Sequence, residues 1–421
     1  MRSVGPHARN PDQVTRNEAS FDGRLLMLAA IGSYLTAVAV ARVAWGVDLW
    51  RWFGVPSVHP IFFDARNITS AIACHAQGLD PLVENPCDLA ARPMNYPRVW
   101  LALRWLGLDD QTVIVFGAAL LVAFVWAVWV LVGRLRPREG LLVAAAMCSP
   151  AVMFAVERGQ SDLVAFVLVV VAVLAWRTGA DTWRTLSPLA VLAAAILKLF
   201  PVVALGAFLL ARHTRAAVTA TVSGVVFVVY AIATLPDLRA IADVLPQGQH
   251  QAYGVRILPA VVYHRYVADA WYGGDTVRQA LAVILLVGVA SVAWWLASRR
   301  LALPEPTDPR DPVEWRELAL HSGGLIYVGT FATANNWDYR LIFLLLILPW
   351  ALHQAPSVAF ARFALGTVVV QLYIGGILTQ RSLADEIVSW TVAALLAMLL
   401  IVATRSALSW MRQTVAVGLF R

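Results

Sequence analysis

The sequence predicts an all-α fold: a polytopic bundle of transmembrane helices with a long extracytoplasmic loop after the first span. Of its 421 residues, 60% are hydrophobic and 14% are charged, whereas soluble domains are about half apolar and a quarter charged. The apolar residues form blocks such as Leu120–Leu131 and Leu281–Leu296. Each block belongs to a stretch long enough to cross about 30 Å of hydrocarbon as a helix. A soluble fold could not bury all of these blocks.

Twelve apolar segments are candidate spans. The pair 186–199 and 200–211 has two interpretations: a hairpin that crosses twice, or one long helix kinked at Pro201, which lacks a backbone donor. The fold therefore has eleven or twelve spans, and the two counts give opposite orientations to the residues that follow. The twelve segments are 25–45, 111–133, 140–156, 162–176, 186–199, 200–211, 216–235, 277–298, 318–334, 340–353, 358–379 and 386–404.

Arginine positions predict that both termini lie in the cytoplasm. Short turns such as Arg134–Arg138 and Arg212–Arg215 are rich in arginine, and positive residues favour the cytoplasmic side. The same pattern accounts for the net charge of +7 without a nucleic-acid partner, because the basic residues are scattered between spans. The predicted parts are an N-terminal tail (1–24), a transmembrane domain (25–404) with extracytoplasmic loops at 46–110 and 236–276, and a C-terminal tail (405–421).

Asp64 is the first candidate for chemistry, soon after the first span. The run Asp64–Gln77 has helical spacing. Phe62 and Phe63 give this carboxylate an apolar neighbourhood, which suits a general base. The alternative is an aspartate that caps the helix before Ala65.

Cys74 and Cys87 lie in the same predicted extracytoplasmic loop, where disulfides persist. A bridge between them would stabilise the fold by roughly 3 kcal/mol through chain entropy. The alternative is two unrelated thiols. His75 is close, but the spacing matches no metal site.

Two polar turns offer groups for a sugar. Asn95 and Tyr96 lie between two prolines, in a segment that could bind a sugar or phosphate, or form a rigid re-entry into the membrane. Gln160 and Asp162 follow the pair Glu157-Arg158 and could bind sugar hydroxyls. The alternative is that the charged pair only reaches towards the interface.

Two cationic positions suit a phosphate. Lys198 is the single lysine of the chain and lies in an apolar run, where a charge usually marks function; the alternative is a side chain that snorkels to head groups. The cluster Asn335–Arg340 combines amides, aromatic rings, a carboxylate and a guanidinium. Arg340 could bind phosphate bidentately, whereas Trp337 and Tyr339 could be interfacial belt residues. In the second long loop, His250 and His264 are lower-ranked candidates, and nothing in the spacing selects either.

These motifs, in this order, resemble the GT-C superfamily of membrane glycosyltransferases, and more narrowly glycosyltransferase family 87. The matching pieces are Phe63–Asn67, Asn95–Pro97, Gly159–Asp162, Lys198–Pro201 and Asn336–Arg340. The resemblance covers residues 25–350. One departure concerns the late turn: related mannosyltransferases carry a Ser/His-rich turn where this chain has Asn335–Arg340, without histidine.

The resemblance implies an inverting transfer from a polyprenyl-phosphate sugar to a glycolipid or glycan of the cell envelope, on the extracytoplasmic side. Asp64 is implied as the general base, and Lys198 and Arg340 as ligands of the donor phosphate. Mannose is the default sugar, and the departure leaves arabinose, glucose or galactose open. No cofactor or metal is implied. The implied substrate-binding residues are Arg66, Asn67, Asn95, Tyr96, Gln160, Asp162, Asn336, Trp337, Asp338 and Tyr339.

Two other functions compete with this interpretation. A transporter or flippase of polyprenyl-linked lipids needs paired broken helices, ideally in repeated halves, and the sequence offers one candidate, at Pro201. A non-catalytic membrane scaffold leaves Lys198 and the late polar cluster unexplained.

Overall fold

The computed structural model describes residues 21–245, 251–266, 275–299, 313–333, 336–378 and 383–418. The described chain is almost entirely helical, which confirms the predicted all-α class. Its elements, with η for 3-10 helices, are α1 (Arg24–Trp45), α2 (Leu49–Trp52), α3 (Phe63–Ala76), η2 (Arg98–Leu106), α4 (Val113–Val132), α5 (Pro137–Met147), α6 (Pro150–Arg158), α7 (Asp162–Arg177), α8 (Asp181–Leu186), α9 (Pro188–Lys198), η3 (Phe200–Ala204), α10 (Leu205–Leu209), α11 (Thr214–Ala233), α12 (Leu235–Val244), β1 (Ala252–Tyr253), α13 (Ile257–Tyr266), α14 (Asp275–Ser298), α15 (Trp315–Thr333), β2 (Asn336–Trp337), η4 (Asp338–Ile347), α16 (Leu348–Gln354), α17 (Ala359–Ile377) and α18 (Leu383–Gly418).

Several of these helices can cross a membrane, so the protein is a multi-pass membrane protein. Within the described residues, six helices are long and apolar enough to span, and a seventh span is possible if α5 and α6, bent by 55°, are counted together. The six are α1, α4, α11, α14, α17 and α18. The other predicted segments are also helical, but they are shorter, broken or less apolar. Helix α18 extends to Gly418, so most of the predicted C-terminal tail is helical.

The segments 186–199 and 200–211 form a hairpin. Leu199 has a φ of 63° and ends α9, and η3 and α10 return along α15. Asp181, ahead of α9, accepts a hydrogen bond of 3.0 Å from the ring of His213, just after α10. Both ends of the pair therefore meet, and the turn at Leu199 lies at the other end of the bundle.

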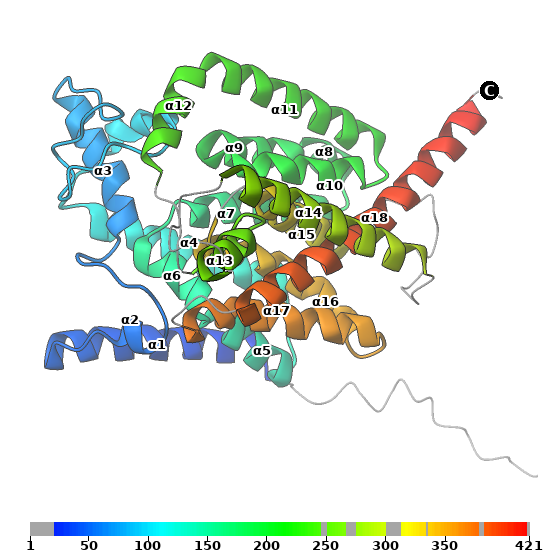
Figure 1. Cartoon of the computed structure of the whole chain (residues 1–421), viewed down its shortest axis with the longest axis horizontal. Helices are drawn as coiled ribbons and strands as arrows, with labels where there is room; N and C mark the ends of the chain where they lie inside the picture. The colour runs from blue at the N-terminus through cyan, green and yellow to red at the C-terminus, as the bar shows by residue number, and fades with distance from the viewer. Residues whose placement is uncertain are drawn as a thin grey trace, which may run out of the picture.

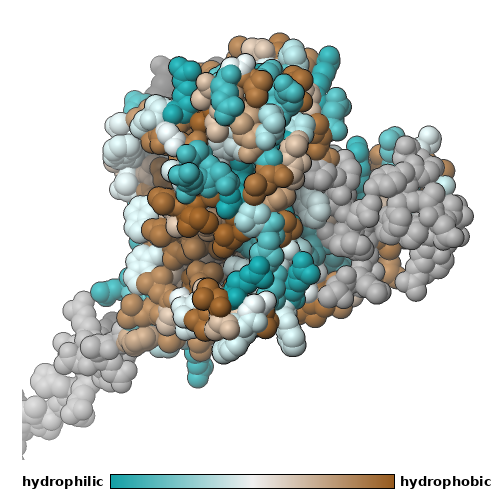
Figure 2. Space-filling view, turned by 90° about the vertical axis from the view of Figure 1, so that its left-hand side faces the viewer, coloured by the Kyte–Doolittle hydropathy of each residue, from teal (hydrophilic) through white to brown (hydrophobic). Residues whose placement is uncertain are grey.

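The arrangement of the helices gives the bundle two distinct ends. Figure 1 shows α1 and α11 along opposite edges, with α3 and its loop at one end. Figure 2 views that end, where hydrophobic side chains gather in the middle of the face between areas rich in hydrophilic side chains. The 3-10 helix η4 forms the centre of the core, because each residue from Leu341 to Ile347 is buried.

A short antiparallel pairing joins two distant polar segments. Ala252 of β1 faces Trp337 of β2, and Tyr253 faces Asn336. This pairing brings the second long loop to the turn that precedes η4.

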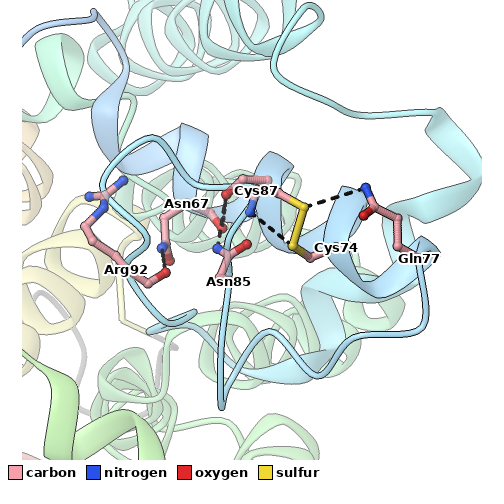
Figure 3. Close-up of a disulfide and its surroundings, with 7 residues drawn as sticks. Asn67, Cys74, Gln77, Asn85, Cys87 and Arg92 are labelled. Carbon is pink, nitrogen blue, oxygen red and sulfur yellow. Dashed lines mark hydrogen bonds between the residues drawn. A yellow bond between two sulfur atoms is a disulfide. The ribbon is translucent and has the colours of Figure 1, made fainter.

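The first long loop is tied to itself and to the bundle. A disulfide joins Cys74 to Cys87, with the Cα atoms 5.7 Å apart (Figure 3). The helix predicted over Asp64–Gln77 is confirmed as α3. The 3-10 helix η2 follows in the same loop, where Trp100 is buried and its indole donates to the Leu197 carbonyl at 3.0 Å.

Candidate active site

Asp64 lies in the first turn of α3, and Phe62 fixes the start of that helix. Phe62 adopts a left-handed φ of 60°, and its backbone N–H donates to the Glu157 carbonyl at 3.0 Å. The Phe62 side chain packs against Gly117 and Gly159. A Cβ added at Gly117 would lie 2.3 Å from the Phe62 ring, and a Cβ added at Gly159 would lie 3.1 Å from the Phe62 Cβ. Two glycines thus make room for the residue that positions α3 against α4 and the α6–α7 turn.

Three donors surround the Asp64 carboxylate. Gln160 donates its amide to Oδ2 at 2.7 Å, while Arg92 donates to Oδ1 at 3.5 Å and Arg158 lies 3.9 Å from Oδ1. The carboxylate keeps 19% of its side-chain surface exposed, so a hydroxyl group can reach it.

Lys198, at the end of α9, extends into a polar cluster formed by the start of α7. Its ammonium lies 3.0 Å from Oδ1 of Asp162 and donates to the Ser161 hydroxyl at 2.9 Å and to Oε1 of Gln160 at 3.2 Å. The same ammonium lies 4.5 Å from the centroid of the Tyr96 ring, a cation–π contact. Because Leu199 turns the chain at this point, the hairpin places the lysine at the α3 end of the bundle.

Asp162 is fully buried between two cations. Arg340 approaches its Oδ2 at 3.7 Å, on the opposite carboxylate oxygen from Lys198. Asn336 accepts a hydrogen bond from Arg340, and the guanidinium lies 4.8 Å from the centroid of the Phe200 ring. A buried carboxylate between two cations leaves one net positive charge, which favours an anionic group nearby.

Gln160 joins the two halves of the site. Its nitrogen donates to Asp64, and its oxygen accepts from Lys198 and, at 3.4 Å, from the Tyr96 hydroxyl. Burial raises the pKa of the Tyr96 phenol well above 10.0, and the Asp64 carboxylate adds to this rise. Tyr96 is therefore a neutral hydrogen-bond donor at physiological pH.

Some predicted sugar-binding residues already have structural partners. Asn67 is 1% exposed; its amide donates to the Arg92 and Pro93 carbonyls, and its oxygen accepts from the backbone of Asn95. Arg66 donates to the Ile61 carbonyl and pairs with Asp110. Asn67 and Arg66 thus shape the first loop, and their contact with a substrate stays a prediction.

The late polar cluster is divided between the core and the site. Trp337 and Tyr339 make edge contacts with Phe154, at ring-centroid distances of 6.2 and 5.3 Å. Asp338 is buried, and its backbone N–H donates to the Gln251 carbonyl at 2.9 Å. Within the part of the chain that the structure describes, the buried Oδ1 of Asn95 has no hydrogen-bond partner, so this amide remains a candidate for a substrate contact.

Sequence reasoning missed Arg92 and its partner Asp88. Arg92 lies over the Phe63 ring at 3.7 Å, donates to the Phe63 carbonyl at 2.7 Å and pairs with Asp88 at 2.8 Å. Burial raises the pKa of Asp88, but the hydrogen bonds and charge of Arg92 outweigh it and hold that pKa below 3.8. Figure 3 shows Arg92 in the same loop as the disulfide. Arg92 and Asp64 are 28 residues apart in the sequence, so no local spacing indicates their contact.

The sequence predicts Arg158 only as a partner of Glu157. It does approach that carboxylate, at 3.3 Å, but it also faces Asp64 and donates to the Pro56 carbonyl. His250 and Asn335 lie outside the described residues, as does the side chain of His264. Within the described residues, no group of three His, Cys, Asp or Glu side chains is arranged to hold a metal ion.

Comparison with known proteins gives a family. The sequence matches the model of glycosyltransferase family 87 over residues 99–308, about half of the chain. The match includes Gln160, Asp162 and Lys198, whereas Asp64 and Arg340 lie outside it. Searches of curated proteins and of solved structures gave no match. With its apolar helices and this family match, the chain is a membrane glycosyltransferase that belongs to family 87.

Proposed function

We propose that this glycosyltransferase moves a sugar, mannose by default, from a polyprenyl-phosphate donor to a hydroxyl group of a cell-envelope glycolipid or glycan. The observation that carries the proposal is the double contact of Gln160 with Asp64 and Lys198. One amide thereby separates a partly exposed carboxylate from a pair of cations that are also only partly exposed. A transfer from a sugar phosphate needs those two groups: a base for the acceptor and a positive site for the leaving phosphate.

In the proposed reaction, Asp64 takes the proton of the acceptor hydroxyl as its oxygen bonds to the anomeric carbon. The bond from that carbon to the donor phosphate breaks, and both electrons leave with the phosphate oxygen. Lys198 and Arg340 stabilise the charge that develops there, since cations fixed in a site of low dielectric act strongly on such charge. Gln160 and Asp162 hold the lysine and orient sugar hydroxyls.

We infer that the site faces the extracytoplasmic side. Support comes from charge at the opposite end of the bundle, where arginines surround the paired ends of the hairpin and favour the cytoplasm. These are Arg177, Arg184, Arg212 and Arg215.

The role of Asp64 is tested by Asp64→Asn, which keeps the shape and the hydrogen bond from Gln160. Loss of general-base catalysis lowers kcat by about 10²- to 10⁴-fold. Transfer is measured in proteoliposomes with labelled polyprenyl-phosphate mannose, and donors with the other three sugars establish sugar specificity. Glu84→Gln, an exposed carboxylate of the same loop, is the matched control and keeps full activity. Turnover at the wild-type rate by Asp64→Asn would show that another group is the base.

A flippase is the competing function, and the same vesicles separate the two. Net movement of labelled donor across the membrane without any glycosidic product favours the flippase. A glycosidic product that requires Asp64 favours the transferase.

A further inference from the structure

A polar cavity lies at the end of the bundle opposite the candidate active site. It has a volume of about 120 Å³ and lies between the α10–α11 turn, α15, α16 and α18. Its polar wall consists of Arg212, Glu317, His321, Gln354 and Ser406. A space of this size can hold a small polar group or several water molecules.

This cavity is separate from the candidate active site. Glu317 and His321 occupy the first two turns of α15, whereas Thr330 near its C-terminal end accepts a hydrogen bond of 2.6 Å from Asn336, beside Arg340. Helix α15 has 19 residues and is therefore about 28 Å long. The two polar sites lie at opposite ends of that helix.

His321 gives the cavity an unmet hydrogen-bonding need. The residue is 7% exposed, and its Nδ1 has no hydrogen-bond partner among the described residues. A buried polar nitrogen without a partner is costly, and native proteins leave few of them. Because His321 lines the cavity, a ligand there can supply the missing partner.

The charges of the cavity suit a group that carries both signs. Arg212 is 7% exposed and interacts electrostatically with Glu317, and both line the cavity. An anion alone would be repelled by Glu317, and a cation alone would be repelled by Arg212. A phosphate next to an ammonium group satisfies both.

The surroundings of the cavity favour a lipid as the source of that group. Leu399 and Val402 line it and belong to α18, within a candidate membrane span. Arg212 lies in an arginine-bearing turn next to the candidate span α11, and such turns lie at the level of lipid head groups. The cavity therefore combines a polar wall with an apolar wall that belongs to a candidate membrane span.

We propose that this cavity binds the head group of a zwitterionic phospholipid that carries a phosphate and a primary amine. The phosphate accepts hydrogen bonds from Arg212 and His321, and the ammonium group lies against Glu317. The chemistry is separate from sugar transfer, so the proposal stands or falls independently of Asp64.

Native mass spectrometry of the full chain tests the proposal, with phosphatidylethanolamine, phosphatidylcholine and phosphatidylglycerol offered in equal amounts. We expect phosphatidylethanolamine to be retained about tenfold better than the other two, as for one charge-assisted hydrogen bond. His321→Leu and Glu317→Gln abolish this preference. His353→Leu, an exposed histidine next to Gln354, preserves it.

Equal retention of the three lipids, or a preference that survives both variants, overturns the proposal. Inorganic phosphate is tested separately by thermal melting. Stabilisation of the wild type by phosphate, without selective lipid retention, assigns the cavity to a free anion and also overturns it. If His321→Leu does not fold, Glu317→Gln decides, because it removes only a charge.

Discussion

Asp64 accepts a hydrogen bond of 2.7 Å from the amide nitrogen of Gln160, and the oxygen of the same amide accepts one of 3.2 Å from Lys198. An amide cannot reverse its two ends without breaking both contacts, so Gln160 fixes the spacing between the carboxylate and the ammonium. We predict that Gln160→Leu lowers kcat by about 10- to 100-fold, as for one or two lost hydrogen bonds to charged groups. The measurement is transfer in proteoliposomes, with the exposed Gln111→Leu as control. An unchanged kcat would mean that Gln160 is only a packing residue.

Lys198 and arginine are not equivalent in this site. We predict that Lys198→Met raises the KM for the lipid-phosphate donor by about tenfold or more, because a charge-assisted contact is lost. Lys198→Arg recovers only part of the affinity, since the compact contacts to Ser161 and Asp162 suit an ammonium group. Donor titration in a transfer assay measures both. A KM equal to the wild-type value in Lys198→Met would exclude a contact with the donor phosphate.

Gly159 is a position where a single methyl group disturbs the site. Its φ of 59° lies in the left-handed region, and an added Cβ would lie 3.0 Å from the Cβ of Ala65, next to Asp64. We predict that Gly159→Ala destabilises the protein by about 1–2 kcal/mol from backbone strain and lowers activity further by displacing α3. Gly224→Ala is the control, because this helical glycine has open space around it. Thermal melting and transfer assays distinguish the two variants, and equal behaviour would contradict the close packing of α3.

The disulfide fixes the loop that carries Arg92. We predict that the double variant Cys74→Ser and Cys87→Ser loses about 3 kcal/mol of stability, the value expected for a loop of this length. Activity also falls, because Asp88 directly follows Cys87 and pairs with Arg92, which in turn contacts Asp64. Cys148→Ser, which removes a free thiol, leaves both properties unchanged. Denaturant unfolding provides the comparison, and identical midpoints for the two variants would contradict a stabilising bridge.

Asp88 makes stability depend on pH. Its pKa in the folded protein is below the ordinary value of 3.8 because Arg92 stabilises the carboxylate. Folding therefore gains stability above pH 3.8, and that gain is lost as the pH falls through the lowered pKa. We predict that Asp88→Asn has a lower melting temperature than the wild type at pH 6, and that the difference shrinks towards pH 3. Glu84→Gln shows no such convergence, and a difference that is constant with pH would refute the role of Asp88.

The helices of this fold can be predicted from the sequence because membrane helices require long apolar runs. Each of the twelve predicted segments is helical in the structure, although 140–156, 200–211 and 340–353 are each divided between two helices. The reversal at Leu199 was not readable, since a kinked helix and a hairpin share the same apolar pattern around Pro201. What distinguishes them is one left-handed backbone angle at a leucine, and no local propensity predicts that angle.

The site was partly readable for a related reason. Lys198 is conspicuous because a charge in an apolar run is costly, whereas Gln160 and Asp162 are conspicuous as part of a polar turn between two apolar segments. Arg92 lies in a polar loop, where an arginine does not by itself indicate a functional site. Its value arises from a distant contact with Asp64, and such pairings depend on how the loop folds back rather than on spacing along the chain.

Because the chain reverses at Leu199, the stretch between Asp181 and Arg215 leaves one side of the bundle and returns to the same side. The later helices start from the side to which this stretch returns, and Arg340 lies 3.7 Å from Asp162. A substitution that straightened the turn would leave the nearby helices intact and yet place the second half of the chain on the wrong side of the bundle. The assembly of the site thus depends on the number of passages that the chain makes along the bundle. The left-handed backbone conformation of Leu199 determines that number.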